Sequence, residues 1–115
     1  MNSESNMPEE KKLTVLYRVE PGCLGPNGKT QIDAFCEFAS NKIKSMGLSF
    51  LSWDIQPRND KKLPEMQFFI MGRNVSFEQA GIYMKKFGQD FEAFSDKLDD
   101  EMANYIDLFL GGMVK

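Results

Sequence analysis

The octapeptide LTVLYRVE at residues 13–20 decides how this chain is expected to fold. Apolar side chains take every second position, which predicts a half-buried strand, and Leu16 is one apolar residue on its other face. Pro21 and Gly22 follow at once and end the strand. The inward face carries Leu13, Val15, Tyr17 and Val19. The rest of the chain must therefore supply a core for this face.

The segment that follows is the clearest helix in the sequence. Residues 30–33, Thr-Gln-Ile-Asp, resemble a capping box with Asp in place of the preferred Glu, and Gly47 supplies the stop. Apolar side chains recur between these signals at helical spacing: Ile32, Phe35, Cys36, Ala39, Ile43 and Met46. We therefore expect an amphipathic helix that packs on one face of a sheet.

Two more strands are expected in the middle of the chain. Residues 48–56 (LSFLSWDIQ) alternate between apolar and polar, and residues 66–71 (MQFFIM) form a short apolar run. Turn-forming residues, 57–62 (PRNDKK), lie between them. This order predicts a hairpin whose loop has about eight residues, which is long for a hairpin.

The C-terminal third is predicted to be helical. A capping box at residues 76–79 (SFEQ) opens it, and an apolar stripe then runs in steps of three and four without losing phase at Gly88. The stripe comprises Ala80, Met84, Phe87, Phe91, Phe94, Leu98, Met102, Tyr105 and Phe109. An unbroken stripe favours one long helix from Phe77 to about Leu110, since a glycine inside a helix costs only about 1 kcal/mol. Two helices that meet at Gly88 are the alternative.

The expected fold class is α+β, in the order β-α-β-β-α. We expect a three-stranded sheet with its helices on one face and a long C-terminal helix. Residues 1–12 are expected to form a disordered tail, and residues 13–115 a single domain. This order resembles the ferredoxin-like plait without its last strand. The resemblance concerns the order of elements over residues 13–110 and implies no function.

The composition narrows the functional classes. The 115 residues include no histidine and two cysteines, which removes the common His-dependent catalytic groups and zinc sites. A net charge of −3 gives no reason to expect a nucleic-acid partner, and no apolar run is long enough for a membrane span. We therefore expect a cytoplasmic protein with no cofactor and no metal, and we assign no catalytic residue.

The loop at residues 22–30 (GCLGPNGKT) resembles a phosphate-binding loop at first sight. The motif G-x-x-x-x-G-K-[ST] would need a glycine at position 23, where this chain has Cys23, and Pro26 removes a backbone N–H. Nucleotide hydrolysis is therefore not expected. The loop still leads into a helix N-terminus, which favours anions. The candidate anion seat comprises Cys23, Gly25, Gly28, Lys29 and Thr30.

A continuous C-terminal helix of 34 residues would extend about 50 Å, far beyond strands of about 27 Å. Its apolar stripe would then need a partner to cover it, and a second copy of the chain is the simplest one. The candidate interface comprises Phe91, Phe94, Leu98, Met102, Tyr105 and Phe109. The sheet face without helices is a second candidate surface for a dimer.

Two functional hypotheses follow. The first is a non-catalytic protein-interaction or regulatory domain, homodimeric through the long helix, the open sheet face or both. The second is a domain that binds a small ligand or anion through residues 23–30. An enzyme is the least favoured class, because no complete catalytic constellation is present.

Overall fold

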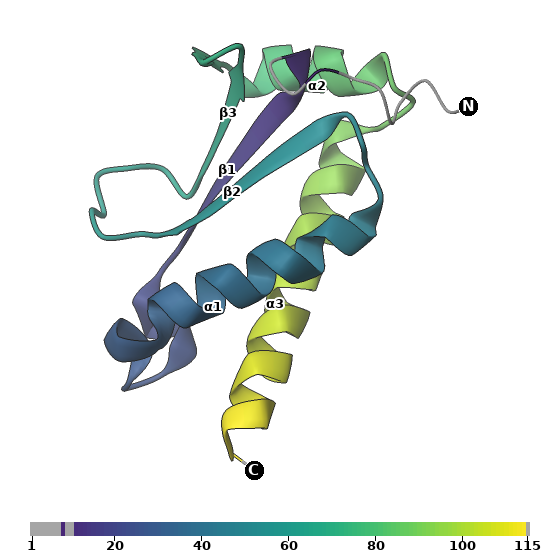
Figure 1. Ribbon diagram of the computed structural model, residues 1–115. Coiled ribbons are helices and arrows are strands. Elements are labelled where there is room, and N and C mark those ends of the chain that lie inside the picture. Colours follow the sequence, from purple (N-terminus) through teal and green to yellow (C-terminus); the bar gives the residue numbers. More distant parts are fainter. Residues whose placement is uncertain (1–7, 9–10, 115) are drawn as a thin grey trace.

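The computed structural model describes residue 8 and residues 11–114, and Figure 1 shows the arrangement of their helices and strands. Most of the predicted N-terminal tail lies outside the described residues. The elements are β1 (Leu13–Val19), the 3₁₀ turn η3 (Pro21–Leu24), α1 (Gly28–Ile43), the 3₁₀ turn η4 (Lys44–Met46), β2 (Leu51–Pro57), β3 (Met66–Ile70), β4 (Arg73–Val75), α2 (Phe77–Lys85) and α3 (Phe91–Val114).

The four strands form one mixed sheet in the order β2-β1-β3-β4. β1 runs parallel to β2 and antiparallel to β3. The predicted hairpin of β2 and β3 is therefore wrong, because β1 lies between them. The sheet also has a fourth strand, so the three-stranded truncated plait is not matched. The α+β class and the long C-terminal helix are confirmed.

The segment between β2 and β3 crosses the end of β1. The N–H of Arg58 donates to the carbonyl of Val19 at 2.8 Å, and the N–H of Arg18 donates to the carbonyl of Glu65 at 2.7 Å. Two strand spacings amount to about 10 Å, and eight extended residues can span more than twice that distance. The same loop length is thus compatible with a hairpin or with a crossing.

The predicted single helix is wrong, because the chain turns at Gly88 and separates α2 from α3. Gly88 adopts a φ of 76°, in the left-handed region. Its N–H donates to the carbonyl of Lys85, and the N–H of Gln89 donates to that of Met84, each at 3.0 Å, which is a Schellman motif. Asp90 then caps the next helix, since its Oδ2 accepts from the N–H of Ala93 at 2.9 Å.

The core lies between the sheet and the helices. Val15, Trp53 and Phe68 share one face of the sheet, because they are register partners on neighbouring strands. Helices cover that face, as predicted: the ring of Phe94 in α3 stacks on Trp53 with centroids 6.0 Å apart, and Phe77 in α2 meets Phe68 edge-on at 5.5 Å.

The turn at Gly88 folds α3 back across α1 (Figure 1), so the expected overhang does not arise. Four residues of the candidate interface are buried within the chain: Phe94, Leu98, Met102 and Tyr105. Phe109 is half-buried and packs edge-on against Phe35 of α1, with centroids 5.4 Å apart. The reason for expecting a partner on this stripe therefore no longer holds.

The other face of the sheet has no helix in the part of the chain that the structure describes. Leu16 lies at its centre and is nevertheless only 6% exposed, because the neighbouring strands flank it on both sides. Arg18 is also buried, and its guanidinium donates to the carbonyl of Pro64 at 2.8 Å. Phe50, which precedes β2, stacks on Phe87 after α2, with centroids 4.5 Å apart.

Over the described residues, no helix combines the length and the apolar character that a bilayer crossing requires.

Candidate functional site

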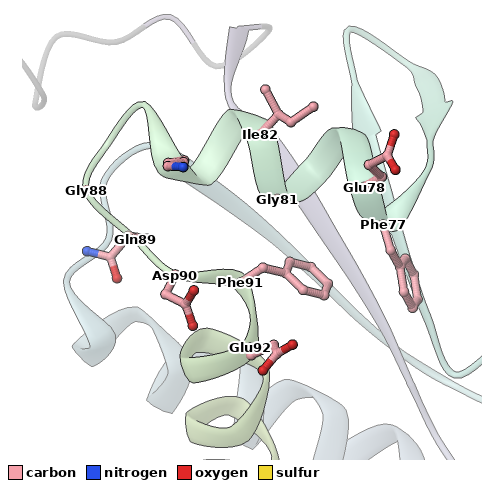
Figure 2. Close-up of a pocket in the computed structure, with 10 residues that line it drawn as sticks. Phe77, Glu78, Gly81, Ile82, Gly88, Gln89, Asp90, Phe91 and Glu92 are labelled. Carbon is pink, nitrogen blue, oxygen red and sulfur yellow. The ribbon is translucent and has the colours of Figure 1, made fainter.

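Among the hollows lined by residues that the structure describes, two stand out by their volume. We name the first the α1 pocket: it has a volume of about 790 Å³ and is lined by residues of the segment 20–32 and by Arg58, Asn59 and Lys61. We name the second the α2–α3 groove: it has a volume of about 710 Å³ and is lined by residues of the segments 77–85 and 88–92. Figure 2 shows this groove.

The α1 pocket coincides in part with the predicted anion seat. Gly25, Gly28 and Lys29 line it, whereas Cys23 and Thr30 do not. Cys23 borders a separate small cavity that also touches the core, and the hydroxyl of Thr30 donates to the carbonyl of Asn27 at 2.8 Å. The structure therefore brings three of the five predicted residues into one hollow.

Two glycines of this loop are required by its backbone conformation and close packing. Gly25 has a φ of 91°, which side-chain-bearing residues rarely adopt. A Cβ on Gly28 would lie 1.8 Å from the backbone carbonyl oxygen of Pro21, so only glycine allows the 3₁₀ turn to fold against the start of α1. Gly28 thus fixes the path of the loop and the position of the helix end.

Two cations reach the pocket from a distant part of the sequence. Because β1 and β2 are parallel neighbours, the segments that follow their carboxyl ends lie together, and Arg58 and Lys61 join Lys29 there. The guanidinium of Arg58 donates to the carbonyl oxygens of Leu63 and Lys61 at 3.1 and 3.2 Å. It also lies 3.7 Å from the carboxylate of Glu20. Sequence reasoning missed both cations, since residues 57–62 were interpreted only as a turn.

The N-terminus of α1 has no side-chain cap, although the N–H of Gly28 donates to the carbonyl of Gly25 at 3.0 Å and the N–H of Thr30 donates to that of Asn27 at 3.1 Å. Its N-cap residue, Asn27, makes no side-chain capping hydrogen bond, and its first turn contains no acidic residue. The first backbone N–H groups of a helix carry a partial positive charge that an anion can satisfy. Lys29 in the first turn adds a full positive charge. The pocket therefore combines a helix N-terminus with three cationic side chains and one carboxylate.

The α2–α3 groove has the opposite character. The aromatic rings of Phe77 and Phe91 point toward the same opening in Figure 2, and their centroids are 5.8 Å apart. Phe68 lies beneath both rings and is fully buried. The polar lining is mostly acidic: it comprises Glu78, Asp90 and Glu92, which we name the acidic rim, and the cation Lys85.

The cysteine chemistry offers no nucleophile in either hollow. Both cysteines are free, and Cys36 is buried in the core, as its place on the apolar stripe predicted. Burial, with a smaller contribution from the charge of Asp33, raises the pKa of the Cys36 thiol to about 11. Within the described ranges, no three Cys, Asp or Glu side chains cluster in a way that would hold a metal ion.

Comparison of the chain with protein-family models, with curated proteins and with solved structures gave no match.

Proposed function

We propose that this protein is a non-catalytic binding domain whose α1 pocket holds a small anionic ligand, of the phosphate or carboxylate class. One observation carries the proposal: Lys29, Arg58 and Lys61 line one pocket at the N-terminus of α1, with Glu20 as its one carboxylate, in a chain whose net charge is −3. Positive charge gathered on an acidic protein favours an anionic partner.

The position of the pocket within the sheet supports the same proposal. It lies at the carboxyl ends of two parallel strands, β1 and β2. Ligands of open α/β sheets bind in crevices outside the carboxyl ends of parallel strands. A helix N-terminus in such a crevice is a frequent seat for a phosphate group.

The expected affinity for a minimal anion is modest. A helix N-terminus contributes about 0.3–1 kcal/mol toward an exposed charge, and an exposed ion pair contributes about 0.2–1 kcal/mol. Even at the upper ends of these ranges, one helix end and three cations together supply about 4 kcal/mol, so the Kd for inorganic phosphate should be about 1 mM or weaker. A larger ligand would fill more of the 790 Å³ and bind more tightly.

The test is an NMR titration of the whole protein with inorganic phosphate at constant ionic strength, with sodium chloride as the balancing salt. We expect a saturable shift of the backbone amide of Lys29, because this N–H group lies in the first turn of α1 and Gly28 already donates its own N–H to the carbonyl of Gly25. The double variant Lys29→Ala, Lys61→Ala should weaken binding by about tenfold or more.

The matched control is Lys97→Ala, which removes an exposed helical lysine that lies outside the pocket. It should leave the affinity unchanged. Shifts that never saturate, or equal losses in the control and the double variant, would show that phosphate only screens the surface charge.

A homodimer remains a second proposal, now resting on the open sheet face alone. That face carries the half-buried Phe69 and lies beside Met71, whose side chain is 68% exposed. Analytical ultracentrifugation of the wild type and of Phe69→Lys tests it. A dimer that the substitution disrupts is expected, and a monomer at every concentration would exclude it.

A further inference from the structure

The α2–α3 groove is a surface that the anion pocket does not explain. Phe77 is 54% exposed and Ile82 is 57% exposed, and both lie on α2 at the groove. Large apolar side chains that are exposed together mark contact surfaces for other molecules. The groove lies at the α2–α3 turn, apart from the residues that line the α1 pocket.

A missing side chain keeps the groove open. Gly81 lies in the middle of α2, where glycine has a poor helix propensity and φ is ordinary. A Cβ at this position would come 3.5 Å from the Cβ of Phe91, so a longer side chain would occupy the space next to that ring. A ligand backbone or side chain can therefore approach Phe91 closely.

The charge of the groove determines the kind of partner. The acidic rim outnumbers the single cation, Lys85, and Asp90 and Glu92 lie at the N-terminus of α3, which they already neutralise. A partner with lysine or arginine next to its apolar side chains is complementary to this lining. A second copy of α3 is not, since residues 87–115 contain seven acidic and two basic residues.

We infer that the α2–α3 groove docks a basic amphipathic helix of another protein. One apolar side chain of that helix enters between Phe77 and Phe91, above the buried ring of Phe68. Lysine or arginine side chains on the flanks of the helix meet the acidic rim. The mode is that of a helix in an apolar groove, where a few anchors carry most of the affinity.

The test is a selection from a displayed library of random 16-residue peptides on the immobilised whole protein. We expect the recovered peptides to carry a net positive charge and apolar residues at helical spacing. The Kd of a representative synthetic peptide is then measured by fluorescence anisotropy at low and high salt. Its affinity should fall as the salt concentration rises, because the rim contacts are electrostatic.

Two sets of variants locate the binding. Phe77→Ala should lower the affinity for the peptide by tenfold or more. The double variant Glu78→Gln, Glu92→Gln should lower that affinity by about three- to tenfold. The matched controls are Leu108→Ala and Asp100→Asn, which change an exposed apolar and an exposed acidic residue of α3 outside the groove. Both should bind as the wild type does. If Phe77→Ala does not fold, Ile82→Ser serves in its place.

Several outcomes would overturn the inference. The selection could recover no binding peptide, or it could recover peptides that are acidic or neutral. The groove variants could also bind the peptide as tightly as the wild type does. A wild-type dimer that Phe77→Ala dissolves would assign the groove to a second copy instead. The result is separable from that for the α1 pocket, because Lys29→Ala should leave peptide binding intact.

Discussion

The α1 pocket and the α2–α3 groove are built alike and charged oppositely. Each forms where a glycine-containing turn leads the chain into a helix N-terminus: Gly25 precedes α1, whose first residue is Gly28, and Gly88 precedes α3. In α1 the first turn has no acidic residue and no side-chain cap, whereas α3 carries its own carboxylates, Asp90 and Glu92. The residues next to the glycine thus decide whether the helix end remains available to an anion.

The largest effect is expected at the floor of the groove. Phe68→Ala should lower the free energy of unfolding by about 3–5 kcal/mol, because a fully buried ring is removed and a cavity remains. Phe77→Ala should cost about 1 kcal/mol or less, since 54% of that side chain is already exposed. Urea denaturation measures both. Equal losses would mean that Phe77 belongs to the core and that the groove is closed in solution.

The glycines of the two hollows should respond differently to the same substitution. Gly28→Ala is expected to destabilise the protein by about 1–3 kcal/mol, because its Cβ would collide with the carbonyl of Pro21. Gly81→Ala is expected to be neutral or stabilising by up to about 1 kcal/mol, since its Cβ makes an ordinary contact with Phe91. Thermal unfolding of the two variants measures this difference in stability. A tolerated alanine at 28 would contradict the tight turn.

Alkaline pH tests whether both hollows depend on one core. Burial raises the pKa of Cys36 to about 11 and that of Tyr105 to about 12, and it also raises the pKa of Tyr17. The folded protein therefore keeps these groups protonated at pH values where the unfolded chain releases their protons. Stability is complete below about pH 8 and falls as the pH rises, by about 2 kcal/mol at pH 10.

The measurement is denaturant unfolding at pH 8 and pH 10 with a reductant present, followed by the fluorescence of the single tryptophan, Trp53, and by circular dichroism. Cys36→Ala should remove about half of the loss. Two separate transitions would show that the hollows rest on independent units, and a stability that does not change would contradict the raised pKa values.

The smallest effect concerns the helix caps. Asp90→Ala should cost about 1 kcal/mol, because the N–H of Ala93 loses its acceptor. Asn27→Ala should cost only a few tenths of a kcal/mol, since Asn27 makes no capping bond. The difference between their unfolding midpoints in urea measures the contrast. Equal costs would mean that α1 is capped in solution and that its N-terminus is not available to an anion.

Most helices and strands could be predicted from the sequence, because each one depends on residues that are neighbours along the chain. Alternation located β1 and β2, a short apolar run located β3, and the apolar stripe located α1. Strand order did not follow, because alternation shows which face is buried and says nothing of which strand lies alongside. β4 was missed because three residues are too few to show a pattern.

The turn at Gly88 was missed for a different reason. Phe87 and Phe91 both face the core on either side of the turn, so the apolar spacing continues although the helix does not. The signal was present in the residues themselves: glycine followed two positions later by aspartate combines a helix stop with an N-cap. Weighing these local signals above the phase of the stripe would have separated α2 from α3.

Only part of the candidate site could be predicted from the sequence. Lys29 could be found from its place at a helix start, but Arg58 and Lys61 reach the pocket only because β1 and β2 are parallel neighbours. β1 and β2 are far apart along the chain, so no local sequence pattern could predict that they pair. The groove was not predicted at all, since it exists only where the helix breaks.

The central position of β1 affects how the chain is made. β1 leaves the ribosome well before its neighbour β3, which begins only at Met66. At about 5–20 residues per second, the strand waits roughly 3–11 s for the second partner. Residues 13–57 can form a β-α-β unit in that interval, but one edge of β1 stays unpaired and open to another chain. Covering this edge during synthesis would therefore keep β1 from pairing with another chain.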